Sequence, residues 1–524
     1  MDQTLVFLLV TILNKTNNYK TTKMKKFFIL ISTVGLLSTG CRKIEIDGNT
    51  TTVTTPTGTE NTILEGRIIQ NLTLKSQFTY KLRGLVYVTN GAILTIQPGT
   101  KIVGELNRNG ALIICRGAKI IADGTAASPI IFTSEAATPQ RGDWAGLLLL
   151  GQAPTNSSFN GTDGVGEIEG GINNADGLGL YGLGLSSNVA DNSGILRYVR
   201  IEYAGYAFLP DKEINGLTFA GVGNQTIIDN VQVSYANDDS FEWFGGTVNC
   251  KHLIAYRGLD DDFDTDNGYS GKVQFGIGLR DSAVADISKS EAFECDNDAN
   301  GSTRTTILTP IAASANNPTP IVPVKTSAIF CNMTAIGPKA TATSVGNSLF
   351  LAGAQLRRNC EESIVNSIFV GWNGGSVNGL LIDGSKGTPT DLNLVGYTPP
   401  GGSSNSSSVL LNFSNNIIAG TTSNAVSYAA SSTNSTGSNT ASILAWVNNS
   451  SNANTITANN SDVGLGAPFN YVTPDFNPTS ATAMAATGAS FTSSRLVGFT
   501  AVNYRGACAV GDTWWKGWTK FSQQ

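Results

Sequence analysis

Histidine is almost absent from this chain of 524 residues, and the cysteines lack the spacings that are typical of metal sites. His252 is the only histidine, which argues against a histidine-based metal centre. The cysteines form no CxxC pair, so no zinc site is expected. The six cysteines after Cys41 either form disulfides, which an exported protein permits, or lie buried and apolar on strands. They are Cys115, Cys250, Cys295, Cys331, Cys360 and Cys508.

Charged residues are also scarce, at 14% of the chain, and acidic residues outnumber basic ones. The formal net charge is −5, and it becomes −9 without residues 1–40, because these contain five lysines and one aspartate. An acidic body argues against nucleic acid as a partner. Glycine, serine, threonine and asparagine are abundant instead, which is typical of secreted β proteins.

No apolar run is long enough to span a bilayer, which takes about 20 residues. The run Phe27–Leu37 follows Met24 and two lysines and precedes small residues and Cys41, the order of a bacterial lipoprotein signal. Ser38 departs from the usual lipobox, in which leucine is commoner. We expect lipidation of Cys41 and attachment to the outer membrane, at the cell surface or on its periplasmic face. Residues 1–23 are interpreted as an upstream extension, although Met1 and Met24 both remain possible starts.

The rest of the chain divides by composition. Residues 41–61 are threonine-rich and without periodicity, as expected of a flexible tether. Residues 62–490 carry short apolar runs separated by turns, and within them a Ser/Thr/Asn-rich stretch at about 401–462 is interpreted as an insertion. Only Ser442–Asn449 has a possible helical period. Residues 491–524 are rich in aromatic residues and are predicted to form a C-terminal cap.

The apolar runs repeat at a regular interval. Leu85–Val88, Ala92–Ile96 and Thr100–Val103 are separated by Asn-Gly and Pro-Gly turns, and the next round begins at Leu112, which repeats the position of Val86. Short apolar runs at this spacing indicate coils of a β-solenoid. The predicted fold class is all-β, a single-stranded right-handed parallel β-helix with loop insertions.

Three segments carry a family resemblance: 91–102, 124–134 and 504–507, the last shortly before Trp518 and Thr519. With these motifs the chain resembles a family of right-handed parallel β-helix lipoproteins of Bacteroidota. The resemblance covers most of residues 62–524 and implies a pectate-lyase-like solenoid at the outer membrane. It supplies no catalytic residues, because the function of that family is largely unknown.

Acidic stretches recur at 238–242, 260–266 and 294–298, each about one expected coil after the last. Consecutive coils would then place Glu242, Asp264 and Glu294 in one column and Asp266 above Asp296. Like charges at the strand spacing of about 4.8 Å repel unless they are protonated or bridged by a cation. Ca²⁺, which binds oxygen ligands alone, would resolve the conflict. The candidate calcium ligands are Asp260, Asp262, Asp264, Asp266, Asp296, Asp298 and Asn300.

Two other interpretations of these residues stay open. Asp and Asn in a solenoid often accept backbone N–H bonds in solvated turns. Parallel β-helices also host polysaccharide lyases and hydrolases, which need carboxylates, or Ca²⁺ with a basic residue. Candidate catalytic residues are Asp264, Glu294, Glu242, Lys272 and Arg280. Candidate platforms for stacking sugar rings are Trp243, Tyr269 and Trp372.

These observations lead to three functional hypotheses. The first is an outer-membrane-anchored scaffold, stabilised by Ca²⁺, that binds a polysaccharide or an outer-membrane receptor and is held to the bilayer through lipidated Cys41. The second is a polysaccharide lyase or glycoside hydrolase that uses the stacked carboxylates. The third is a structural adhesin. Only fold analogy supports enzymatic activity, so a binding role is the leading prediction.

Overall fold

The computed structural model describes residues 62–209, 212–302, 325–341, 343–373, 377–402, 410–432 and 436–521. The predicted signal peptide, Cys41 and the tether lie outside these residues. None of the helices within the described ranges is long and apolar enough to cross a membrane.

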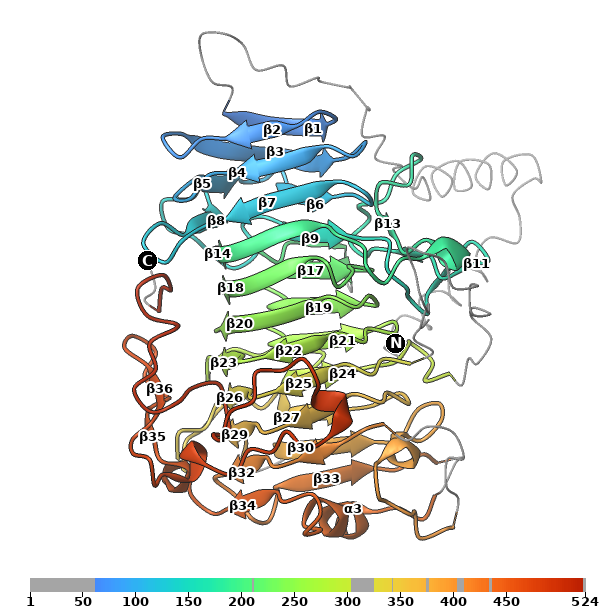
Figure 1. Ribbon diagram of the computed structural model, residues 1–524, viewed down its shortest axis with the longest axis vertical. Coiled ribbons are helices and arrows are strands. Elements are labelled where there is room, and N and C mark those ends of the chain that lie inside the picture. Colours follow the sequence, from blue (N-terminus) through green and yellow to red (C-terminus); the bar gives the residue numbers. More distant parts are fainter. Residues whose placement is uncertain are drawn as a thin grey trace, which may run out of the picture. The chain divides into compact units, whose positions relative to one another are not determined.

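The described chain winds into a right-handed parallel β-helix, which confirms the predicted fold class (Figure 1). Strands of successive coils pair in parallel and form three faces, here named A, B and C. Face A contains β2 (Leu72–Leu74), β4 (Ile93–Ile96), β7 (Lys119–Asp123), β14 (Gly194–Glu202), β18 (Ile227–Ser234), β20 (Asn249–Tyr256), β22 (Lys272–Gln274), β25 (Ile329–Cys331), β28 (Ser363–Val365) and β31 (Phe413–Ser414).

Several strands are long enough to bend and belong to two faces. Face B contains β1 (Ile63–Ile68), β3 (Thr79–Val88), β5 (Lys101–Gly104), β8 (Ile130–Ser134), the second halves of β14, β18 and β20, and then β23 (Ile277–Leu279), β26 (Thr334–Ile336), β29 (Ile368–Val370), β32 (Ile417–Ala419) and β34 (Thr455–Thr457). Face C contains the second halves of β1 and β3, and then β6 (Ala111–Ile114), β9 (Gly146–Leu150), β17 (Leu217–Ala220), β19 (Phe241–Phe244), β21 (Phe263–Asp266), β24 (Ser290–Cys295), β27 (Phe350–Leu356), β30 (Asn378–Asp383) and β33 (Val426–Ala429).

From β14 onward, the corner between faces A and B is made by one residue per coil in the left-handed region of backbone space. Asn230 (φ 55°), Asn332 (φ 55°), Asn366 (φ 54°) and Asn415 (φ 56°) occupy this position in their coils. Asparagine tolerates positive φ better than most residues with a side chain. The recurring asparagine of these coils is therefore a corner residue.

The interior is filled by inward side chains that stack from coil to coil. On face C the rings of Phe241, Phe263 and Phe293 lie 5.6 Å and 5.2 Å apart between centroids, one per coil. The predicted start of a new round at Leu112 is confirmed, because Val86 pairs with Leu112. The six cysteines that the structure describes are buried and unbridged, so the alternative of buried apolar cysteines holds.

The last coils correct the expected insertion at 401–462. The described part of this stretch contributes β31, β32, β33 and β34 to the main sheet, so it belongs to the solenoid. The helix expected near Ser442–Asn449 is present as α3 (Thr440–Val447), with Asn439 as its N-cap. Its Ile443, Trp446 and Val447 are buried in the same core as the coils, so α3 packs on the end of the solenoid beside β33.

The aromatic C-terminal segment, here residues 464–521, runs along the flank of the coils (Figure 1). It contains β35 (Leu465–Ala467), β36 (Asp475–Pro478) and the 3-10 turns Met484–Ala486 and Ser494–Leu496. Ser490 exchanges hydrogen bonds with Asn366, and Lys520 is bonded to Gln232 of β18, several coils nearer the N-terminus. The prediction of a cap is therefore wrong in its position, because these aromatics cover the outer surfaces of faces A and B.

A second excursion covers the early coils of face C. Residues 151–193 leave the sheet after β9 and return at β14, and they include the small hairpins β10 (Ser158–Phe159) with β11 (Thr162–Asp163) and β12 (Gly166–Glu167) with β13 (Leu180–Tyr181). A further hairpin, β15 (Ala207–Leu209) with β16 (Lys212–Glu213), follows β14. Ile168, Ile172 and Tyr181 pack on outward-facing Leu148 and Ala220. The outer surface of face C is thus apolar and covered up to β17 and Phe244 of β19, and outward carboxylates follow on β19, β21 and β24.

A candidate cation site on two acidic columns

The first acidic column lies on the outer surface of face C. Side chains alternate on β19 and β21, so Phe241 and Phe263 enter the core while Glu242 and Asp264 point outward. Glu242 pairs in register with Asp264, and Asp264 with Glu294. The predicted column of these three residues is confirmed.

A second column has the members Asp239, Asp261 and Glu291: the two aspartates lie in the turns before β19 and β21, and Glu291 lies at the start of β24. The backbone N–H of Asp261 donates to Asp239 Oδ1 at 2.8 Å, and that of Glu291 donates to Asp261 Oδ1 at 2.6 Å. All three residues are buried. Sequence reasoning did not select them, although they follow one another at the same intervals along the chain as the members of the first column.

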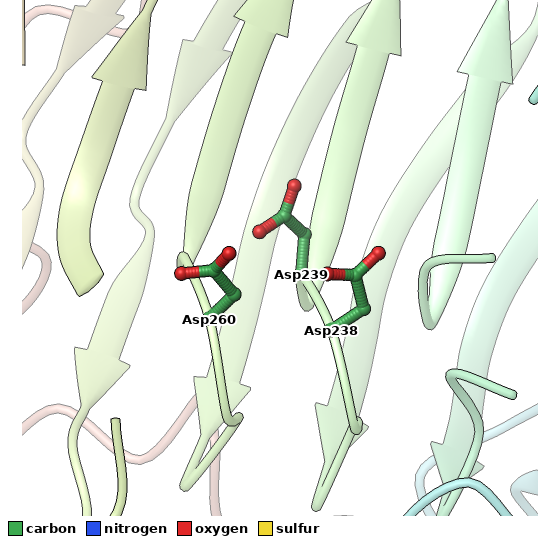
Figure 2. Close-up of side chains that lie close together, drawn as sticks. All are labelled: Asp238, Asp239 and Asp260. Atoms are coloured by element: carbon green, nitrogen blue, oxygen red, sulfur yellow. The ribbon is translucent and has the colours of Figure 1, made fainter. Parts of the chain in front are cut away.

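The two columns bring carboxylates into direct proximity. Ligand oxygens of Asp239, Glu242 and Asp264 lie within 4.8 Å of one another, and those of Asp261, Glu291 and Glu294 form a second such group. Figure 2 shows a third group at the edge of the columns, in which Asp238 and Asp239 of one turn face Asp260 of the next.

Protein cations neutralise only part of this charge. Arg357 bridges Glu294 and Asp296, with its Nε 2.7 Å from Asp296 Oδ1, and Arg358 also contacts Asp296. Glu242 accepts a hydrogen bond from Asn215. In contrast, Asp264 Oδ1 and both side-chain oxygens of Glu291 are buried without a hydrogen-bond partner. Buried acceptors of this kind are rare unless an ion or water completes them.

Burial is the main cause of the pKa shifts in and beside these columns, and neighbouring carboxylates add to it. The pKa of Glu242 is raised well above its usual value by burial and then by Asp264 and Asp239. The pKa of Glu291 is raised to about 7, mainly by burial. Burial and Asp296 raise the pKa of Asp266 to about 8. Near neutral pH the columns therefore hold protons that a cation could displace.

Asp262 does not belong in the expected set of calcium ligands, because it is paired with an arginine. Its side chain is fully buried, and Arg280 Nη1 donates to its Oδ1 at 3.0 Å. Arg280, itself fully buried, also donates to the backbone oxygen of Leu259 and lies over the ring of Phe350. Asp262 thus has its counter-charge inside the protein, and Arg280 is not exposed to bind an acidic sugar or act as a base.

Asp298 and Asn300 agree with the alternative interpretation, in which these residues form the hydrogen bonds of a turn. Asp298 Oδ1 accepts the N–H groups of Asn300 and Ser302, at 2.8 Å and 3.2 Å. Asp296 is occupied by its two arginines. Of the seven expected calcium ligands, Asp260 and Asp264 lie in the groups of close carboxylates.

The remaining candidate residues lie elsewhere. Trp243, Tyr269 and Trp372 are fully buried, and Trp243 stacks between Phe219 and Tyr269 in the core. The prediction that they stack on sugar rings is corrected, because no ring face is open to a ligand. Lys272 belongs to face A, where its Nζ donates to the backbone oxygen of Val497, so it is not beside the columns.

Comparison with known families agrees with this architecture. A family model described as a pectate-lyase-like β-helix domain matches residues 66–519. The chain belongs to this family. The match includes both acidic columns and nearly all of the C-terminal segment, so the pectate-lyase-like β-helix domain is the whole described body. No curated protein and no solved structure matches the chain.

Proposed function

We propose that this β-helix is a carbohydrate-binding scaffold whose central coils are stabilised by Ca²⁺ on the acidic columns. One observation carries the calcium proposal: Asp239, Glu242 and Asp264 place oxygens within 4.8 Å of one another, and Asp264 Oδ1 has no partner. Ca²⁺ takes six to eight oxygen ligands in flexible geometry. Carboxylates and backbone oxygens of the turns offer that donor set, whereas nitrogen and sulfur ligands are not found in these groups.

The close spacing of the carboxylates suits a bound ion better than it suits an inverting glycosidase. The two catalytic carboxyl groups of a glycosidase are about 5 Å apart in retaining enzymes and about 6.5–9.5 Å apart in inverting ones. One oxygen of each grouped carboxylate lies within 4.8 Å of the others, which is shorter than the separation in inverting enzymes. A lyase would also need a base beside the columns, and Arg357, which lies there, is bound to Glu294 and Asp296.

The family supports a carbohydrate-related role for the scaffold, either in binding or in cleavage. Its proposed location is the outer membrane, through a lipid on Cys41, as in the β-helix lipoproteins of Bacteroidota that the sequence resembles. The proposed partners are a polysaccharide or an outer-membrane receptor. Incorporation of labelled palmitate that is lost in Cys41→Ser would support the anchor, and unchanged labelling would contradict it.

Thermal unfolding of the purified protein tests the calcium site. In chelator the Asp239→Asn, Asp264→Asn double variant should be at least as stable as wild type, because two repelling charges are gone. With Ca²⁺ at 100 times its Kd, wild type should gain about 2.7 kcal/mol of stability, and the double variant should gain little. Asp298→Asn, which alters a turn carboxylate outside the groups, serves as the matched control and should gain as wild type does.

Equal gains by all three proteins would contradict the assignment of calcium to these columns.

The same samples, incubated with neutral and acidic polysaccharides, separate binding from cleavage. Retention without chain shortening supports the scaffold, and shortening by wild type alone would instead establish an enzyme. Neither retention nor shortening would contradict both carbohydrate functions.

A further inference from the structure

A groove separate from the acidic columns lies where the C-terminal segment meets face A. Its cavity volume is about 320 Å³, within the range of small-molecule sites. The floor is the outer surface of β18, β20 and β22, and the wall is the C-terminal segment around Gly498 and Phe499. Register places Asn249 beside Ile227 and Lys251 beside Asp229 on this floor.

The wall of the groove is held in place by paired hydrogen bonds. Gln274 Nε2 donates to the backbone oxygen of Thr500 at 2.8 Å, and the Thr500 N–H donates back to Gln274 Oε1 at 2.9 Å. Gly498 has a φ of 93°, so a residue with a side chain would be strained at this turn. The groove is therefore formed before any ligand binds, which lowers the entropic cost of binding.

The lining has a positive charge in a chain that is acidic as a whole. Lys251 Nζ donates to Thr500 Oγ1, and Lys272 Nζ donates to the backbone oxygen of Val497. An ammonium has three N–H donors, so each lysine keeps donors for a ligand. The one carboxylate of the lining, Asp229, is hydrogen-bonded to His252 at 2.7 Å. Burial, and then the charge of Arg495, lower the pKa of Lys272.

The same groove offers apolar surface and amide donors. Ile227 is 41% exposed, which is unusual for an isoleucine on a sheet, and half-buried Phe499 borders it. Asn249 Oδ1 accepts the backbone N–H of Lys272 at 3.0 Å, so the amide NH₂ of Asn249 can donate to a ligand. Apolar contact, amide donors and two ammonium groups suit a ring with C–H faces, hydroxyl groups and a negative substituent.

We propose that this groove, here named the face A groove, binds a sugar unit that carries a carboxylate or a sulfate, with Lys251 and Lys272 on the anionic group and Phe499 against the ring. The proposal rests on the proposed carbohydrate-binding function and assigns it a site. It needs no calcium, because the face A groove shares no residue with the acidic columns.

Calorimetric titration of the purified protein tests the groove. The probe is a hexasaccharide of alternating glucuronate and N-acetylglucosamine, compared with its carboxyl-reduced form, a sulfated form and inorganic sulfate. The Lys251→Gln, Lys272→Gln double variant should bind the acidic hexasaccharide at least about tenfold more weakly. Phe499→Leu, which keeps apolar packing but removes the ring, should weaken binding about fivefold. The matched control is Lys101→Gln, Lys119→Gln, which removes two lysines from β5 and β7 and should leave the affinity unchanged.

The two anionic forms show which substituent is preferred, and the carboxyl-reduced form should bind as weakly as the double variant. Equal binding by wild type and the double variant would overturn the groove while leaving the glycan-binding function intact. Inorganic sulfate that binds as tightly as the hexasaccharides would also overturn it, because the sugar ring would then add nothing. No binding of any hexasaccharide by wild type would overturn the groove, and retention of the polysaccharide panel would then decide whether the scaffold binds carbohydrate elsewhere. Unfolding temperatures of all variants should match wild type, since each changed side chain is at least partly exposed.

Discussion

Faces B and C of one β-helix carry opposite kinds of outer surface. On face B the outward residues include Tyr235, Ile254 and Leu279, and the chain covers them with Trp515 and Trp518 of its own C-terminal segment. On face C the outward residues from β19 to β24 include the carboxylates Glu242, Asp264 and Glu294, and the cations that the described chain places in ion pairs there are Arg357 and Arg358. An apolar surface is thus completed within the fold, whereas the acidic surface is left for protons or a cation.

This difference predicts which changes weaken each face. Hydrophobic contact on face B involves no titrating charge, so pH and dissolved cations affect it far less than a change of sequence does. Repulsion on face C depends on pH and on dissolved cations, because both alter the charge of the columns. Face B should therefore govern the basal stability, and face C should make that stability depend on the solvent.

The largest expected effect is on face B. Trp515 is 2% exposed and packs edge-on against Phe476, with ring centroids 5.5 Å apart. Trp515→Ala should lower the free energy of unfolding by about 3–5 kcal/mol, because a large cavity replaces the indole. Val510→Ala, at a residue that is 49% exposed in the same segment, should change it by less than about 0.5 kcal/mol. Urea titration followed by tryptophan fluorescence measures both, and a small effect of Trp515→Ala would show that the segment is not a stabilising cover.

The next effect is the pH dependence of face C in the absence of calcium. The pKa of Glu291 rises from its ordinary 4.5 to about 7 in the folded protein, so between these values the folded state holds a proton that the unfolded state has lost. Stability is then complete below about pH 4.5 and falls as pH rises to about 7, by roughly 3 kcal/mol for this one residue. Asp266, with a pKa of about 8, extends the fall further. Chelated protein should therefore unfold at a lower temperature at pH 8 than at pH 5.

Two experiments, added Ca²⁺ and a substitution of the interior residue Glu362, separate the sources of this pH dependence. Added Ca²⁺ should reduce the loss of stability at pH 8, because it replaces the protons of the columns. Glu362 is fully buried in the interior, where it accepts from Cys295 and Thr265, and burial raises its pKa to about 8. It adds a fall of the same sign that calcium does not affect, and Glu362→Gln should remove that part alone. A stability that rises with pH in chelator would contradict the account of both groups.

The fold and one column could be predicted from the sequence, because both depend on the repeat. Strand register follows the spacing of apolar runs, so the recurrence of the acidic stretches placed Glu242, Asp264 and Glu294 correctly. The position of Asp262 could not be predicted in the same way. It lies in the turn before β21, where the alternation of strand side chains does not apply, and its partner Arg280 comes later in the chain, directly after β23.

The C-terminal segment shows a second limit of sequence reasoning. Its aromatic residues indicate that the segment is buried. The hydrophobic effect is non-directional, however, so the composition does not tell which surface the segment covers. The surface that it covers is set by outward tyrosines and aliphatic residues of strands from many coils, from Tyr203 to Ala419. A cap on the solenoid end and a cover on its flank have the same composition, and only the three-dimensional structure separates them.

The smallest expected effect concerns Arg357, a protein cation that neutralises the carboxylates of face C as a metal ion would. Its guanidinium bonds Glu294 and Asp296, so it already supplies part of the charge that a cation would supply. In Arg357→Gln the columns lose this charge but keep a polar side chain. Calcium should then bind about tenfold more tightly, or roughly 1.4 kcal/mol, because a close like charge no longer opposes it.

Calorimetric titration with Ca²⁺ measures this change in affinity. Arg197→Gln, which breaks a partly exposed ion pair with Asp123 on face A, is the control that should leave calcium affinity unchanged. Weaker calcium binding in Arg357→Gln would mean that the arginine orients Glu294 toward the ion. The columns would then have to be regarded as one arginine-dependent site, in which the protein cation and the metal cooperate instead of competing for the same carboxylates.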